Sequence, residues 1–232
     1  MSNNKIITKL SNLTLATLFT GLAKYATITF LVGSKAMLLS ASSIISPMLG
    51  ILGGKRFSLL YFISQFFLNF LKITLLGYKF ILLGYQIPQF FASFYWLSSS
   101  RLARSIVPII SIILFIAHPT GYLAWKYATL WLIPILISFF AFDKIFFKAL
   151  GATFTAHSVG SVLWIYSIPM SPESFISLIP IAIIERILFA LGMISVYYFV
   201  IFVKSLKGQT IELHSRMIGF NDKAFSNNDG WQ

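Results

Sequence analysis

The chain has 232 residues, of which 57% are hydrophobic and only 10% are charged. Soluble domains carry about 25% charged residues, and no soluble fold of this size hides so much apolar surface, so the composition predicts an integral membrane protein. The 18 basic residues outnumber the 6 acidic ones, but they lie between apolar runs instead of forming one patch, which argues against a nucleic-acid partner. The chain contains no cysteine, which excludes disulfides and thiolate chemistry.

Eight apolar segments follow one another along the chain. They cover residues 13–32, 36–53, 57–76, 80–97, 105–118, 121–142, 146–168 and 175–203. A helix needs about 20 residues to cross the hydrocarbon core of a bilayer, and the last three segments meet this length well. The second segment contains Pro47 and Gly50 and is followed by Gly54, and the next two short segments contain Pro88 and Pro108. We therefore expect broken or kinked helices at these positions.

The distribution of basic residues predicts the orientation. If the N-terminus is inside and every segment crosses, 12 of the 18 basic residues lie inside, 2 lie outside and 4 lie within segments. Because cytoplasmic loops carry the excess of Lys and Arg, we predict cytoplasmic termini and an even number of crossings. The expected fold is an all-α, polytopic transmembrane helix bundle of six to eight membrane segments. A cytoplasmic N-terminus over 1–12 precedes a transmembrane domain over 13–203, and a polar, basic cytoplasmic tail over 204–232 follows.

The segment 146–168 combines a stripe of small residues with a polar strip. Small residues recur every four positions, a spacing that lets another helix approach closely: Ala152, Ala156 and Gly160. Next to them, His157, Ser161 and Trp164 are spaced i, i+4 and i+7 and share one helix face. The strip is compatible with interhelical hydrogen bonding or with contact to a ligand. A single histidine without a second ligand at suitable spacing argues against a metal site.

The last segment, 175–203, places the pair Glu185–Arg186 near the middle of an apolar run. A charge at this depth costs roughly 3 kcal/mol on insertion scales, and such residues face a protein interior or a water-filled cavity. Neighbouring residues on a helix project about 100° apart, so we expect each to take a separate partner. The candidates for Glu185 are Lys24, Lys126 and His157. For Arg186, the candidate partners are a ligand carboxylate or free backbone carbonyls. The pair is therefore compatible with a structural ion-pair network and with a ligand-binding site.

Three stretches of the chain, together with its size, basic charge and predicted topology, carry a resemblance to a transporter family. They are SPMLGILGG at 46–54, GATFTAHSVGS at 151–161 and LIPIAIIER at 178–186. With these features the chain resembles the S components of energy-coupling-factor transporters, which are the substrate-capturing membrane subunits. The resemblance implies six helices, a vitamin-sized ligand near the outer leaflet, and a partner scaffold with two ATPases. It also implies a docking stripe of small residues on the first helix, which Thr17 and Gly21, or Ala16 and Thr20, match only imperfectly, with Lys24 next on the second stripe.

We therefore expect a transport or substrate-binding component without its own ATPase, in a bacterial inner (plasma) membrane. The ligand-binding candidates are His157, Ser161, Trp164, Glu185 and Arg186, and the excess of buried basic residues favours a small anionic, vitamin-like solute. The expected partners are the lipid bilayer, the small-molecule solute, and a membrane scaffold with ATPase subunits.

Two other functions remain open. The first is a structural or assembly subunit that uses the small-residue stripe as its contact surface. The second is an intramembrane enzyme acting on a lipid, with His157 or Glu185 as the base. No catalytic residue, metal site or cofactor is assigned, because the sequence contains no G-x-S-x-G, H-E-x-x-H or P-loop motif.

Overall fold

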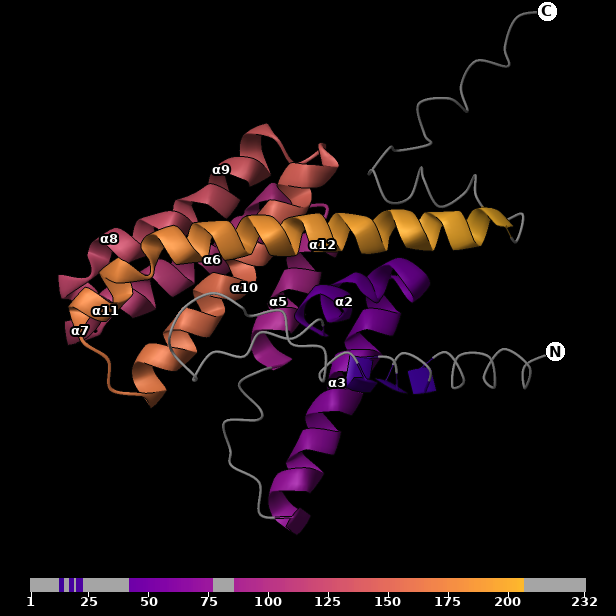
Figure 1. Ribbon diagram of the computed structural model, residues 1–232, viewed down its shortest axis with the longest axis horizontal. Helices are drawn as coiled ribbons and strands as arrows, with labels where there is room; N and C mark the ends of the chain where they lie inside the picture. The colour runs from indigo at the N-terminus through magenta and orange to yellow at the C-terminus, as the bar shows by residue number, and fades with distance from the viewer. Residues whose placement is uncertain (1–12, 15–16, 19, 23–41, 77–85, 207–232) are drawn as a thin grey trace, which may run out of the picture.

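The computed structural model describes residues 13–14, 17–18, 20–22, 42–76 and 86–206, and the regular structure in these residues is entirely helical. The elements are α2 (Ser42–Met48), α3 (Gly50–Leu76), α5 (Gln86–Leu97), α6 (Arg101–Ala117), α7 (Pro119–Leu123), α8 (Trp125–Ala128), η1 (Thr129–Trp131), α9 (Leu132–Phe140), α10 (Ile145–Ser167), α11 (Pro172–Ser177) and α12 (Ile179–Leu206) (Figure 1). The all-α prediction is confirmed for this part of the chain. The predictions on 1–12, Ala16, Lys24 and the tail beyond 206 lie outside the described residues.

The predicted break in the second segment is confirmed. Helix α2 contains Pro47 and ends at Met48, and Leu49 forms a turn before α3 begins. Within α3, Gly54 adopts φ 75° and ψ −170°, which kinks the helix. This backbone region is essentially open only to glycine, because a Cβ would clash there. The sequence SPMLGILGG therefore bends the chain twice within a few residues.

The segment 121–142 is not the single membrane-spanning helix that its length predicts. The structure divides it into α7, α8, η1 and α9. Helix α7 starts at Pro119, where His118 Nδ1 accepts a hydrogen bond from the Thr120 amide at 3.2 Å. Gly121 lies directly against the carbonyl oxygen of Phe115, at a place where any Cβ would overlap that oxygen. These contacts shape the turn at the start of α7, and Ala124, with φ −99° and ψ 24°, separates α7 from α8. Residues 125–140 then follow one helical path through α8, η1 and α9, which is shorter than the predicted segment.

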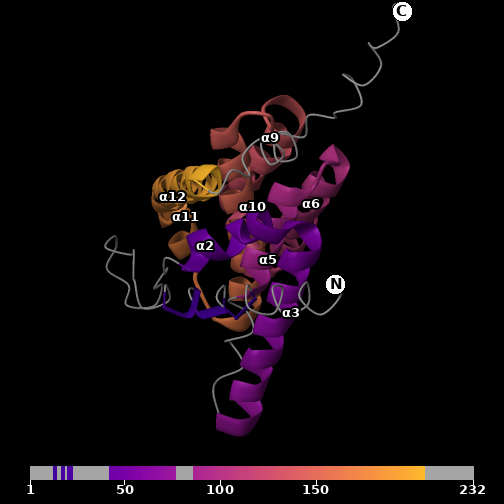
Figure 2. The ribbon, with the colours of Figure 1, turned by 90° about the vertical axis from the view of Figure 1, so that its right-hand side faces the viewer.

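Helix α10 is the centre of the molecule. It packs against α5, α6, α9 and α12, and the views in Figures 1 and 2 place it among them. One side of α10 joins a buried cluster that consists of Met48, Ala92, Tyr95, Trp96, Ala149, Ala152, Ala190, Met193 and Tyr197. Its other side joins a second buried cluster, with Phe115, Ala124, Tyr127, Ala128, Leu130, Trp131, Phe154, Ile165, Phe175 and Ala182. Because α10 has neighbours on both sides, four of its polar side chains are buried between helices: Thr153, Thr155, Ser158 and Ser161.

Two of the described helices are long and apolar enough to cross a membrane. These stretches are 54–75 in α3 and 179–202 in α12, and only 28% of the most apolar window of each is buried inside the protein. Figures 1 and 2 show α12 along the long axis of the molecule, whereas α3 projects away from it. The predicted six to eight membrane segments are therefore unconfirmed among the described residues, and helices such as α5, with 12 residues, are too short to cross alone.

Candidate functional site

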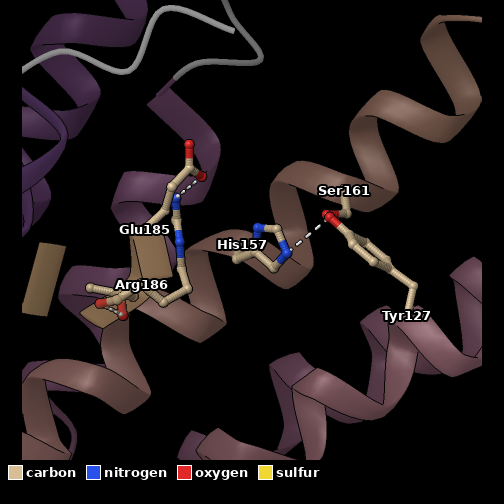
Figure 3. Close-up of polar contacts among 6 residues, drawn as sticks. Tyr127, His157, Ser161, Glu185 and Arg186 are labelled. Carbon is tan, nitrogen blue, oxygen red and sulfur yellow. Dashed lines mark hydrogen bonds and ion pairs between the residues drawn. The ribbon is translucent and has the colours of Figure 1, made fainter. Parts of the chain in front are cut away.

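Three side chains from α8 and α10 meet at the hydroxyl group of Tyr127. The Tyr127 oxygen lies 2.9 Å from Nε2 of His157 and 3.3 Å from Oγ of Ser161. Tyr127 and Ser161 are buried, with 3% and 7% of their surface exposed. A phenol carries one proton, so it donates to one of these neighbours and accepts from the other. The spacing of i and i+4 on α10 directs both neighbours toward α8, as Figure 3 shows.

Tyr127 was not identified from the sequence. It lies beside Lys126 in an apolar run, and its hydrogen-bond partners follow more than 25 residues later in the chain. Its ring packs against Phe115, Trp131 and Phe175 at centroid separations of 5.7, 6.0 and 5.3 Å. An aromatic cage therefore fixes the position of the phenol, and this cage exists only after α6, α8 and α11 have come together.

Glu185 and Arg186 pair with each other, so the expectation of separate partners is wrong. Arg186 Nη2 donates to Glu185 Oε2 at 3.3 Å. The two Cβ atoms project apart, but both side chains are long enough to bend together along the surface of α12. The Arg186 guanidinium also lies over the ring of Phe189, 4.8 Å from its centroid. Among the predicted partners of Glu185, Lys126 is exposed and Lys24 lies outside the described residues.

Arg186 is a buried cation with few polar contacts. Only 7% of its surface is exposed, and its Nε atom has no hydrogen-bond partner among the described residues. Its one ion pair in this part of the chain is a single N–O contact, not the bidentate fork that a guanidinium makes with a well-placed carboxylate. Arg186 therefore retains donor capacity inside the protein.

The hydroxyl cluster and the ion pair are neighbours. The Oγ1 of Thr153, one turn before His157 on α10, donates to the backbone carbonyl of Arg186 at 3.3 Å. In Figure 3 the His157 ring lies between Tyr127 and the Glu185–Arg186 pair. We call Tyr127, His157, Ser161, Glu185 and Arg186 the polar cluster.

Trp164, the third member of the predicted strip, is not part of the polar cluster. It is half-buried, and its indole makes no side-chain hydrogen bond within the described part of the chain. The small-residue stripe faces α5 at its two ends. Ala152 is fully buried in the cluster that contains Tyr95 and Trp96, and Gly160 lies next to Pro88. Because Ala152 packs inside the chain, it offers no surface to another subunit.

A second buried arginine, also missed from the sequence, has a different environment. Arg104 donates from Nη1 to the carbonyl of Ser98 at 2.8 Å and from Nη2 to that of Ser138 at 3.2 Å. These carbonyls lie at the C-terminal ends of α5 and α9, where helix dipoles favour a cation. Its guanidinium also stacks 3.4 Å from the centroid of the Phe142 ring. Arg104 thus joins three elements, which is a structural role.

Hydroxyl, imidazole and guanidinium groups make up the donors of the polar cluster. No group of three or more His, Cys, Asp or Glu side chains that would hold a metal ion occurs in the part of the chain that the structure describes. His157 Nε2 contacts the Tyr127 phenol, so this nitrogen is engaged by Tyr127 and does not activate Ser161. What the cluster offers is a buried guanidinium beside hydroxyl and imidazole groups, which together recognise carboxylate or phosphate oxygens.

Comparisons of the chain with protein-family models, with curated proteins and with solved structures each find no match.

Proposed function

We propose that this chain is an integral membrane protein that captures a small anionic solute at the polar cluster. The observation that carries the proposal is the buried guanidinium of Arg186, which has one single-contact acid partner among the described residues and lies beside the Tyr127–His157–Ser161 hydrogen bonds. A buried cation is costly to maintain. A ligand carboxylate that replaces or supplements Glu185 would give Arg186 the second acceptor that its fork geometry allows.

Membrane insertion is supported by the surface of the molecule. Large apolar side chains project outward along both candidate spans, such as Phe67 in α3 at 59% exposed and Phe199 in α12 at 64%. A continuous apolar exterior of this kind is unfavourable in water and favourable in lipid. The distribution of basic residues, 12 inside and 2 outside, supports a polytopic arrangement of six to eight segments with both termini in the cytoplasm. The location that we propose is a bacterial inner membrane.

Substituted cysteines test this topology without background, because the natural chain has no cysteine. Asp143 and Glu173 are both exposed, and they flank α10 at its two ends. An impermeant maleimide should label Glu173→Cys in intact cells, whereas Asp143→Cys should react only after the membrane is permeabilised. Equal labelling of both variants in intact cells would contradict a crossing by α10.

In this proposal the chain binds the solute, but we identify no energy source in it, so uptake of the solute would depend on partner proteins. The resemblance to S components of energy-coupling-factor transporters leads us to propose a membrane scaffold and ATPase subunits in this role. The alternative of an assembly subunit built on the small-residue stripe is less well supported, because Ala152 is buried against the chain's own helices.

Pairs of ligands that differ only in charge test the proposed binding. We would measure the melting temperature of the purified protein with benzoate and benzamide, and with nicotinate and nicotinamide. A ligand that binds only the folded state raises this temperature, in proportion to RT ln(1 + [L]/Kd). The acids should stabilise the wild-type protein more than the amides do, and Arg186→Met should remove the difference.

The matched control is Arg104→Lys, which alters a buried arginine outside the polar cluster. It should lower the melting temperature of the free protein but retain the preference for acids. If no acid in the panel stabilises the wild-type protein more than its amide, or if Arg186→Met keeps the preference, the site is not an anion site for this ligand class.

A further inference from the structure

Four basic residues gather where α6 and α10 begin. They are Arg101 and Arg104 at the start of α6, and Lys144 and Lys148 at the start of α10. The ring of Phe142 joins the two helices, because the guanidinium carbon of Arg104 lies 3.4 Å from its centroid and Nζ of Lys148 lies 4.9 Å from it. Arg101 is one turn before Arg104, and Lys144 follows closely after Phe142. We call these four cations the basic cluster.

The basic cluster carries an excess of positive charge. Of the acids in the described part of the chain, only Asp143 lies here, because Glu173 is at the other end of α10 and Glu185 belongs to the polar cluster. Four cations therefore face one acid among these residues. Burial lowers the pKa of Arg104, the neighbouring charge of Arg101 lowers it as well, and Asp143 raises it. These charges thus lie within electrostatic reach of one another.

Helix stability does not account for the basic cluster. The N-terminal end of a helix carries the positive end of its dipole, so acids are favoured there and cations are not. Neither α6 nor α10 has an acid in its first turn. Membrane orientation requires only that cations lie in cytoplasmic loops, whereas Arg104 is 3% exposed and Nζ of Lys148 lies 5.0 Å from the centroid of the Trp96 ring. Packing therefore holds two of the four charges at fixed positions, which a bound anion would stabilise.

The accessible part of the basic cluster borders an apolar helix face. Arg101 and Lys144 are exposed, so they can contact a ligand directly, whereas the buried Arg104 contributes its charge without contact. Next to Arg101, α6 begins an exposed stripe of large apolar side chains at i, i+4, i+7 and i+11. The stripe consists of Leu102, Ile106, Ile109 and Ile113. It is about 16 Å long at 1.5 Å per residue. Positive charge at one end of a hydrocarbon surface matches the two parts of an anionic phospholipid.

We propose that the basic cluster binds the phosphate head group of an anionic phospholipid of the cytoplasmic leaflet, with an acyl chain along the exposed stripe of α6. The predicted orientation places the starts of α6 and α10 on the cytoplasmic side, where anionic lipids attract basic residues. A free phosphate ion would use the charges but would leave the apolar stripe uncovered. The lipid site includes no residue of the polar cluster. It rests on the membrane setting of the proposed function, but not on solute binding at that cluster.

Dioleoylphosphatidylglycerol and dioleoylphosphatidylcholine are matched probes, because they share their chains and their phosphate but differ in net charge. We would add each lipid to the full-length, delipidated protein in detergent at low ionic strength and measure the bound fraction by native mass spectrometry. Each cation near a lipid surface contributes about fivefold in affinity for an anionic lipid. Arg101 and Lys144 together should therefore favour phosphatidylglycerol by about twentyfold. Equal binding of the two lipids would overturn the proposal, and this comparison needs no variant.

The double variant of Arg101→Gln and Lys144→Gln should reduce the preference for phosphatidylglycerol to less than about threefold. The matched control is the double variant of Lys72→Gln and Lys126→Gln, which removes the same charge from exposed positions outside the basic cluster. This control should keep the preference. A preference that survives the loss of Arg101 and Lys144, or one that falls equally in the control, would overturn the assignment.

Two salts distinguish the lipid from a free anion. Sodium phosphate and sodium chloride at equal ionic strength should weaken phosphatidylglycerol binding to the same extent, because both act by screening. A stronger effect of phosphate would identify a site for a free anion and would overturn the lipid assignment. These experiments do not use the acid and amide pairs, so their failure would leave the proposed solute site standing.

Discussion

The Glu185–Arg186 pair allows a quantitative test of the buried charges. The two side chains meet at 3.3 Å, and a pair of unit charges at this distance attracts by about 5 kcal/mol at an effective dielectric constant of 20. This value is a ceiling, because the contact is single and the side chain of Glu185 is 17% exposed. We expect a coupling energy of about 3 kcal/mol. Removing one partner of such a pair leaves the other charge buried and uncompensated.

The perturbation is the double-mutant cycle of Glu185→Gln, Arg186→Met and the double variant. Glu185→Gln keeps the side-chain shape and should lower stability by about 3 kcal/mol, which corresponds to a fall in melting temperature of about 6–12 °C for a chain of this length. The double variant should lie within about 1 kcal/mol of the wild-type protein, because both charges are gone. Thermal unfolding in detergent, followed by circular dichroism, measures all four proteins. If the effects of the single variants add up to that of the double variant, the pair is not coupled and the reasoning is refuted.

Four further substitutions test the packing around the site, each by thermal unfolding in the same detergent. Gly151→Ala should destabilise the protein by about 1–3 kcal/mol, because its Cβ would overlap the Tyr95 hydroxyl. At Gly160 an added Cβ would make ordinary van der Waals contact with Pro88, at 3.6 Å, so Gly160→Ala should not lower stability; equal effects would contradict the close approach of α10 to α5. Arg104→Lys should lower stability by about 2 kcal/mol, because one ammonium group does not reproduce the bridge between the ends of α5 and α9, and a neutral result would refute that bridge. Tyr127→Phe should lower the free energy of unfolding by about 1–2 kcal/mol, because it leaves His157 and Ser161 without the hydroxyl that both contact. An unchanged melting temperature would show that the phenol makes no net contribution to stability.

The helical class could be predicted because it follows from chemistry that is local in the sequence. An apolar run must satisfy its backbone groups internally, and a helix does so within a single segment. The break at Gly54 was predictable for a similar reason, since few residues other than glycine adopt its backbone angles. The predicted spacing on α10 also brings His157 and Ser161 toward one neighbour.

The division of 121–142 into short helices was not predictable from its hydrophobicity. The break that shortens the helix lies at the turn between α6 and α8, where Gly121 meets the carbonyl of Phe115 and Ala124 leaves helical geometry, and hydrophobicity does not report such backbone contacts. Tyr127 was missed for a related reason, because a tyrosine in an apolar run gives no sign of partners on α10. The pairing of Glu185 with Arg186 was missed because helical periodicity describes Cβ directions, whereas these two side chains are long enough to bend together.

The central claim is that the polar cluster holds a small anion inside a membrane protein. The most direct test is gentle detergent purification of the tagged wild-type protein and of Arg186→Met, followed by mass spectrometry of everything that is released on denaturation. We predict a stoichiometric small acid with the wild-type protein and its loss from Arg186→Met, with the control Arg104→Lys unchanged. A wild-type protein that is empty in repeated preparations, or an acid that is retained by Arg186→Met, would contradict the claim.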